Sequence, residues 1–149
     1  DEQTAALPDG EKWSIAQIAE HVAIVGGGVY RICAKLMSRA EADGEVFAGQ
    51  LDLSSFAAKA ADSAETKLEA PEFVVPTGEK SIPESIKLLD DTQESLRGLR
   101  PLFEKYDASA VKFPHPYFGD LTAVEWLVLY GGHEGRHLRQ IGRILEKLS

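Results

Sequence analysis

Residues 122–148, TAVEWLVLYGGHEGRHLRQIGRILEKL, show the clearest helical pattern in the chain. Thr122 and Glu125 form the S/T-x-x-E capping box that begins a helix. Apolar residues then recur at steps of three or four, as on one face of an α-helix. That face consists of Trp126, Tyr130, His133, His137, Ile141, Ile144 and Leu148. The stretch therefore predicts one long amphipathic helix that carries two imidazoles toward the protein interior.

Two further segments show the same pattern and predict two more long helices. The pairs Ser14–Gln17 and Ser81–Glu84 are also capping boxes. The first helix should run from Ser14 to about Asp43–Gly44, because glycine is a common helix stop. The second should run from 81 to about 106, with a bend where Pro101 interrupts the backbone hydrogen bonds.

The remaining segments predict less regular structure. Residues 54–70 are rich in alanine but have a thin apolar face, which predicts a short or marginal helix. Residues 107–121 contain prolines and a glycine, which predict a connecting loop with a short extended piece at 111–113.

Size, composition and charge describe one ordinary domain. The 149 residues are 44% hydrophobic and 27% charged, as in soluble globular proteins. The formal net charge of −8 argues against a nucleic-acid or anionic-membrane partner, since both require a basic face. The single cysteine permits no internal disulfide, and no apolar run is long enough to span a bilayer. We expect a single domain over residues 1–149, in the cytoplasm by default, with a small molecule as its partner.

His133 and His137 stand four residues apart on one helix, close enough to bind a single ion. His21, on the interior edge of the first helix, is the natural third ligand. The simpler interpretation is that all three are core histidines with ordinary partners. Burying imidazoles costs free energy unless their nitrogens are bonded, and a shared metal would bond them. Imidazole suits zinc, nickel, copper and iron.

Three segments resemble the DinB-like family of helical metalloproteins. These are WSIAQIAEH at 13–21, PHPYFGDLTAVEWL at 114–127 and HEGRHLRQIGRIL at 133–145. The family shows a Trp-led helix start before a histidine, and a final helix with H-x-x-x-H followed by a glutamine, here Gln140. The resemblance implies an all-α four-helix bundle whose metal ligands are His21, His133 and His137, with zinc or nickel bound. Relatives have a full helix before the Trp-led one, so here either that helix is truncated or segment 54–70 takes more of its load.

The resemblance also implies a function. Relatives include transferases and isomerases that use low-molecular-weight thiols, and others are described as metal-dependent hydrolases. Three protein ligands leave an open coordination position, which favours catalysis over a structural role. We therefore expect a divalent-metal-dependent enzyme, either a thiol-using S-transferase or a hydrolase. The alternative is a non-catalytic metal-binding or dimerising scaffold, with a homodimer as the partner.

Several other residues carry weaker expectations. Cys33 should be a small buried hydrophobe, and His115 should order its loop or touch solvent. Glu20 and Glu134 project about 100° away from the neighbouring ligands, so they should be solvated or lie behind the ligands rather than on the metal.

Two residues that share a helix face with the histidines each have two possible roles. Tyr130 precedes His133 by one turn and either lines a pocket or belongs to the core. Gly28 lies two turns beyond His21, within a helix where each glycine costs about 1 kcal/mol relative to alanine. It leaves room either for a ligand or for close helix packing.

Overall fold

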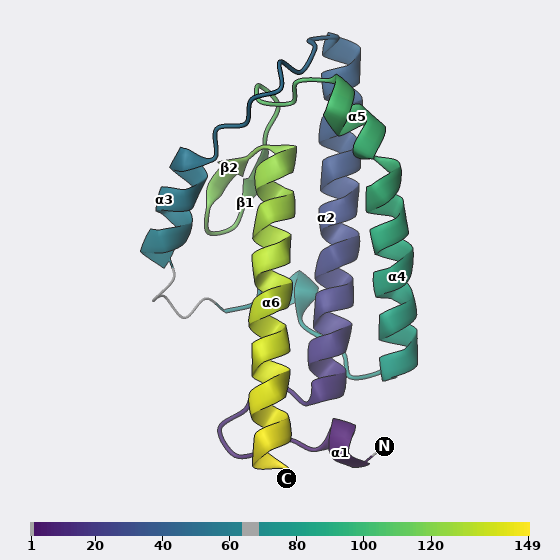
Figure 1. The fold of residues 1–149 in the computed structure, drawn as a ribbon. Coiled ribbons are helices and arrows are strands. Elements are labelled where there is room, and N and C mark those ends of the chain that lie inside the picture. Colours follow the sequence, from purple (N-terminus) through teal and green to yellow (C-terminus); the bar gives the residue numbers. More distant parts are fainter. Residues whose placement is uncertain (1, 64–68) are drawn as a thin grey trace.

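Three long helices lie side by side and form the body of the protein (Figure 1). The computed structural model describes residues 2–63 and 69–149. The helices are α2 (Ile15–Asp43), α4 (Ile82–Gly98) and α6 (Ala123–Lys147), and α2 packs against both of the others. The shorter elements are α1 (Glu2–Ala5), α3 (Ser54–Ser63), the 3₁₀ helix η1 (Glu72–Val74), α5 (Arg100–Lys105), β1 (Phe113–His115) and β2 (Gly119–Leu121). The predicted all-α class is confirmed, and the short α3 contributes the buried side chain of Phe56 to the core.

The starts of the long helices follow the capping boxes. In each box the hydroxyl of Ser14, Ser81 or Thr122 accepts the backbone N–H three residues on, and the side chain there accepts the N–H of the cap. At the other end of α2, Gly44 has a φ of 76° and donates its N–H to Ala40. That left-handed conformation favours glycine, which explains where α2 stops.

Two connecting regions differ from expectation. Pro101 does not bend one continuous helix, because α4 ends at Gly98 and α5 begins at Arg100 with the proline in its first turn. A proline there removes no helical hydrogen bond. The loop before α6 holds a small antiparallel hairpin with Phe113 opposite Leu121, so the extended piece is 113–115 rather than 111–113. Of segment 54–70, residues 54–63 are helical, and 64–68 lie outside the described residues.

The apolar core is divided into two clusters along the bundle. The larger surrounds the second half of α2 and the first half of α6, with Phe56 of α3 buried in it. The smaller joins Ile15, Ile18 and Val22 of α2 to Ile144 of α6. On α6, His133 and His137 fall between these two clusters, whereas on α2, His21 lies within the smaller one, between Ile18 and Val22. The packing of α2 on α6 therefore sets the distance between the imidazoles.

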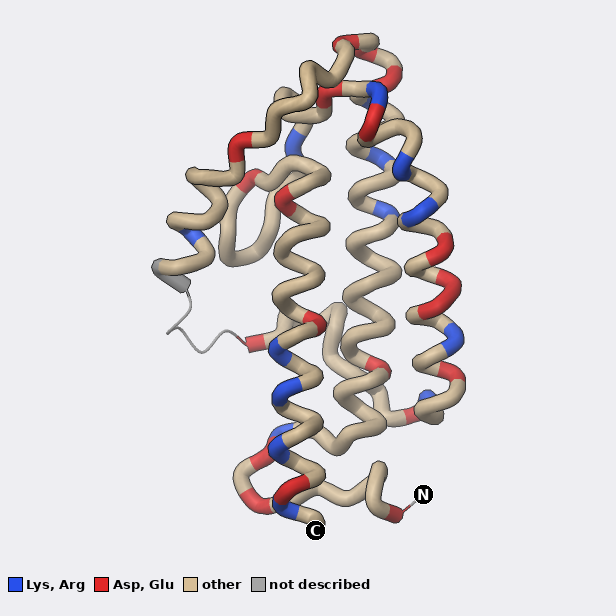
Figure 2. The backbone as a smooth tube through the Cα atoms, in the orientation of Figure 1, with Lys and Arg blue, Asp and Glu red and all other residues tan. Residues whose placement is uncertain are grey.

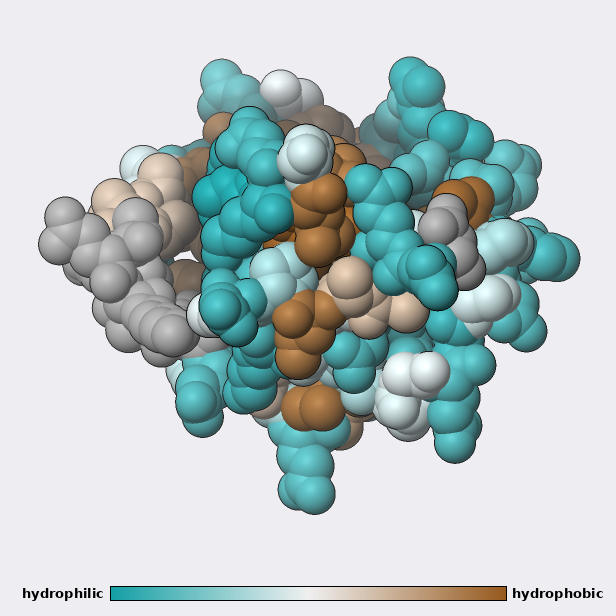
Figure 3. Space-filling model, turned by 90° about the horizontal axis from the view of Figure 1, so that it is seen from below, coloured by the Kyte–Doolittle hydropathy of each residue, from teal (hydrophilic) through white to brown (hydrophobic). Residues whose placement is uncertain are grey.

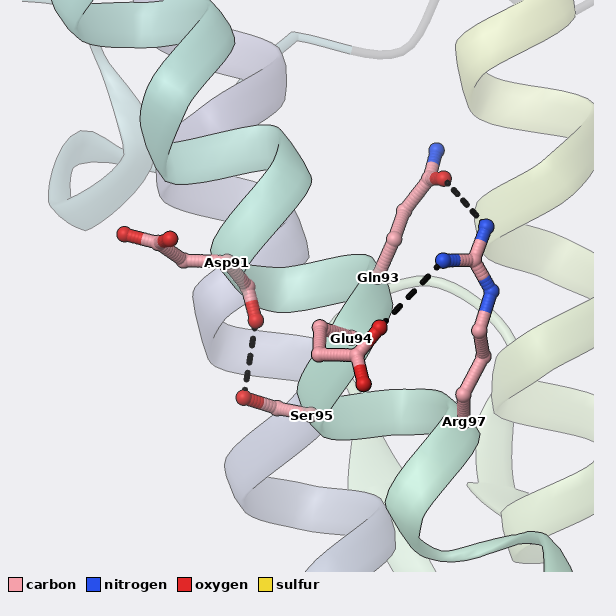
Figure 4. A network of polar contacts seen from close by, with 5 residues as sticks. All are labelled: Asp91, Gln93, Glu94, Ser95 and Arg97. Carbon is pink, nitrogen blue, oxygen red and sulfur yellow. Dashed lines mark hydrogen bonds and ion pairs between the residues drawn. The ribbon is translucent and has the colours of Figure 1, made fainter.

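The outer surface carries polar contacts on the helices as well as exposed hydrophobic residues. On α4, the guanidinium of Arg97 contacts Gln93 and Glu94, and Ser95 donates to the backbone of Asp91 (Figure 4). Such exposed contacts contribute little to stability. At the end of the bundle where the chain terminates, hydrophobic residues come to the surface between hydrophilic ones (Figure 3). Among the described residues, no helix is long and apolar enough to cross a bilayer.

Candidate metal centre

The imidazoles of His21, His133 and His137 converge at one point between α2 and α6. The Nε2 atom of His133 lies 3.0 Å from Nε2 of His21 and 3.2 Å from Nε2 of His137. One ligand atom from each residue lies within 4.8 Å of the other two. A tetrahedral zinc ion with Zn–N bonds of about 2.0–2.1 Å holds its nitrogens about 3.3 Å apart. The three side chains are therefore positioned to bind one metal ion.

The tautomer of His21 is fixed by the backbone of η1. Its Nδ1 atom lies 2.7 Å from the carbonyl oxygen of Val74. A carbonyl only accepts, so Nδ1 carries the proton and Nε2 carries a lone pair. The ring is 3% exposed, and Trp13 packs against it with ring centroids 4.7 Å apart. His21 therefore presents an unprotonated Nε2 from an orientation held on two sides.

The tautomer of His137 is fixed by a chain of hydrogen bonds through Gln140 and Glu11 to Lys147, which we call the Gln140 relay. Its Nδ1 atom lies 3.0 Å from Oε1 of Gln140, whose Nε2 donates to Glu11 at 3.3 Å. The other oxygen of Glu11 accepts from Lys147 at 2.7 Å. Because the carboxylate takes the amide N–H, the amide oxygen faces the ring and Nδ1 must donate. The hydrogen bond from Lys147 also holds the pKa of Glu11 below its ordinary value. Nε2 of His137 therefore carries a lone pair, which faces Nε2 of His133 as that of His21 does.

His133 has no such support on its outer nitrogen. Its Nδ1 atom is buried and has no hydrogen-bond partner among the described residues. Its Nε2 faces the lone pairs of His21 and His137 and can offer only one proton between them. Without a cation, at least one of these buried nitrogens lacks a partner, which costs free energy. A metal ion bound to all three Nε2 atoms removes that cost, so the donor set fits a metal.

The environment keeps the ligands neutral, as metal binding requires. Burial lowers the pKa of His133 to about 3 and that of His137 to about 4, and it lowers the pKa of His21 as well. The guanidinium of Arg136 adds to each of these shifts. The sequence analysis did not single out Arg136, although its spacing of three from His133 places it on the ligand side of α6.

Of the two positions expected for Glu20, solvated or behind the ligands, the structure shows a buried residue that is not part of the three-histidine group. The residue is 1% exposed, and its carboxylate accepts hydrogen bonds from the backbone and hydroxyl of Thr77 and from the backbone of Gly78. Burial alone would raise the pKa of Glu20, but these hydrogen bonds outweigh it and the pKa is lowered. Glu20 and His21 thus hold the same loop, one at 77–78 and the other at Val74.

The remaining candidates lie around this centre rather than on it. Tyr130 belongs to the larger core cluster, and its hydroxyl lies against Gly26. Cys33 is fully buried, and burial raises the pKa of its thiol to about 12, as a structural cysteine should have. His115 orders its hairpin by accepting the N–H groups of Tyr117 and Phe118.

No fourth protein ligand joins the centre within the described parts of the chain, since the group contains only the three histidines. Closed structural zinc sites have four protein ligands, whereas catalytic sites keep a position free. The arrangement therefore has the composition of an open site.

Comparison with known proteins identifies the family of this chain. The sequence profile of the DinB superfamily matches residues 1–141, so the chain belongs to that superfamily. A curated relative, the uncharacterized protein YuaE of Bacillus subtilis (strain 168), is 26% identical over 150 residues, covering 100% of this chain and 87% of YuaE. No solved structure matches the chain.

Proposed function

We propose that this protein is a divalent-metal-dependent enzyme that acts on a small molecule, with zinc or nickel held by His21, His133 and His137. The observation that carries the proposal is the locking of two tautomers. The Val74 carbonyl and the Gln140–Glu11 pair hold the protons of His21 and His137 on their outer nitrogens. Metal-binding histidines are typically oriented by such partners. Histidines of an ordinary core need hydrogen-bond partners, but nothing requires the Nε2 atoms of three such residues to converge.

The chemistry we propose is either transfer of a thiol group or hydrolysis. A bound divalent ion acts as a Lewis acid that lowers the pKa of a coordinated water or thiol. Among the described residues we identify no nucleophile at the centre, because Cys33 is buried and its Sγ lies 3.6 Å from the carbonyl oxygen of Ala123. An external water or low-molecular-weight thiol is therefore the proposed nucleophile.

The surrounding residues have defined tasks in this proposal. Trp13 packs on His21 and excludes water from one side of the site. Arg136 supplies a positive charge near all three imidazoles, which favours an anionic reactant such as a thiolate. Glu20 holds the loop that carries Val74 and thereby keeps His21 in its orientation.

The test is a turnover screen of the metal-loaded protein against thiol acceptors and hydrolysable esters and amides, with and without an added thiol. The matched inactive variant is His137→Ala, and the control is His115→Asn, which alters a histidine outside the metal centre. We expect turnover in the wild type and the control and none in His137→Ala. Turnover that persists in His137→Ala would overturn the proposal.

A further inference from the structure

An open pocket lies beside the metal centre, between α2, η1 and β1. It has a volume of about 330 Å³, and we call it the α2–η1 pocket. The residues that line it include Gly28, Arg31 and Lys35 from α2, Phe73 and Val74 from η1, and Phe113 from β1. Val74 belongs to both features, since its carbonyl accepts the proton of His21. The pocket and the metal centre are therefore neighbours joined through one residue.

Gly28 keeps the floor of this pocket open. A Cβ atom built at Gly28 would meet no atom within 4 Å, so close packing of another helix does not explain the glycine. Gly26 is different, because there a Cβ would collide with the hydroxyl of Tyr130. A glycine inside a helix costs about 1 kcal/mol relative to alanine. At Gly28 the absence of a side chain leaves free space in the pocket and does not serve a packing contact.

The walls combine positive charge with aromatic surface. Arg31 and Lys35 lie one turn apart in the second half of α2, where Lys and Arg positions follow one another (Figure 2). Neither forms a salt bridge within the described ranges, although the chain has a net charge of −8. The Lys35 ammonium lies 5.4 Å from the centroid of the Phe113 ring. Phe73 is 76% exposed, an unusual state for a phenylalanine at the mouth of a cavity.

We propose that the α2–η1 pocket binds an organic anion with a flat apolar body. A carboxylate or sulfonate group contacts Arg31 and Lys35, which are free to form charge-assisted hydrogen bonds. The apolar body lies over Gly28 between Phe73 and Phe113, where it covers the exposed ring. Binding requires only these residues and no metal, so this site stands apart from the proposed metal chemistry.

The probe for this site is 8-anilinonaphthalene-1-sulfonate, an aromatic sulfonate whose fluorescence rises when it leaves water. We expect saturable binding of the probe to the metal-free full chain. Arg31→Gln should weaken that binding about tenfold or more, which corresponds to the loss of one charge-assisted bond. The matched control is Arg39→Gln, which makes the same change two turns further along α2. Equal affinity of the two variants would overturn the proposal.

Filling the pocket gives an independent readout. Gly28→Leu places a side chain on the pocket floor, and Gly131→Leu makes the same change at an exposed site in α6 that also has no atom within 4 Å. Circular dichroism and the melting temperature establish that both variants fold, and Lys35→Gln replaces Gly28→Leu if the latter does not. We expect at least a tenfold loss of probe affinity in Gly28→Leu only. Equal binding by the two leucine variants, or by Lys35→Gln and Arg39→Gln, would contradict the proposal.

The same titration separates this proposal from the metal centre. His137→Ala removes a ligand but leaves the lining of the pocket unchanged, so it should bind the probe as the wild type does. Loss of probe binding in His137→Ala would contradict an independent pocket. Loss of metal in that variant has no bearing on the pocket.

Discussion

The backbone carbonyl of Val74 lies 2.7 Å from Nδ1 of His21, so the loop before α4 sets the tautomer of a ligand on α2. Metal affinity should therefore depend on residues that hold this loop and never reach the metal. Glu20 is the main one, because its carboxylate accepts hydrogen bonds from Thr77 and Gly78.

Glu20→Gln should destabilise the fold by about 1–3 kcal/mol, because it replaces a buried carboxylate that accepts charge-assisted hydrogen bonds. The measurement is the free energy of unfolding in urea. Glu94→Gln is the matched control, since its partner Arg97 lies on the surface with side chains 70% and 80% exposed. The control should change stability by less than about 0.5 kcal/mol. Equal effects of the two changes would show that Glu20 does not anchor the loop.

Gln140→Ala should weaken zinc or nickel binding about 10- to 100-fold, the usual effect of removing the partner of a ligating histidine. Glu11→Gln should act in the same direction through the orientation of the Gln140 amide. Isothermal titration with each metal measures the affinity. Gln93→Ala, a glutamine on the outer face of α4 (Figure 4), is the control and should bind normally. Unchanged metal affinity in Gln140→Ala would show that Gln140 does not orient His137 for metal binding.

Cys33 should not react with a disulfide reagent such as Ellman's reagent while the protein is folded. Burial raises the pKa of its thiol to about 12, so almost no thiolate exists at pH 8. In urea the thiol becomes exposed and should react fully within minutes. Complete labelling at the same rate without urea would refute the buried position and reopen Cys33 as a nucleophile.

Stability should fall with acid in a window set partly by His115. Burial lowers the pKa of His115 from 6.5 to about 4, so the folded protein favours the neutral ring. Its contribution is complete above pH 6.5 and is lost as the pH falls toward 4, because the unfolded chain takes up the proton first. His115→Asn keeps a hydrogen-bond acceptor for Tyr117 and Phe118 but does not titrate. Unfolding measured from pH 8 to pH 4 should therefore show a smaller loss of stability in the variant than in the wild type.

Local sequence patterns predicted the starts of the three long helices and the common face of His133 and His137. The capping boxes at Ser14, Ser81 and Thr122 mark real helix starts, because their hydrogen bonds span only three residues. The spacing of His133 and His137 likewise fixes their common face without tertiary information. His21 was a candidate from its place on the interior edge of the first helix, and the family resemblance implied the same residue. Nothing local shows that α2 and α6 pack at that level.

The supporting contacts could not be predicted because they join distant parts of the chain. The bond from Gln140 to Glu11 spans 129 residues and that from Thr77 to Glu20 spans 57. Glu20 was expected to be solvated or behind the ligand because its direction differs from that of His21 on the helix. The loop that covers Glu20 has no periodic pattern to predict its path. The hairpin at 113–121 was similarly hidden by its prolines, which disfavour strands.

The central claim is that three imidazoles bind one metal ion, and the metal-to-protein ratio of purified variants tests it most directly. Elemental analysis after growth in the native host and dialysis should give one equivalent of zinc or nickel in the wild type and in His115→Asn. The single changes His21→Ala, His133→Ala and His137→Ala should each abolish that content. A full equivalent retained by folded His21→Ala would contradict the claim, because the metal would then be held without the ligand from α2.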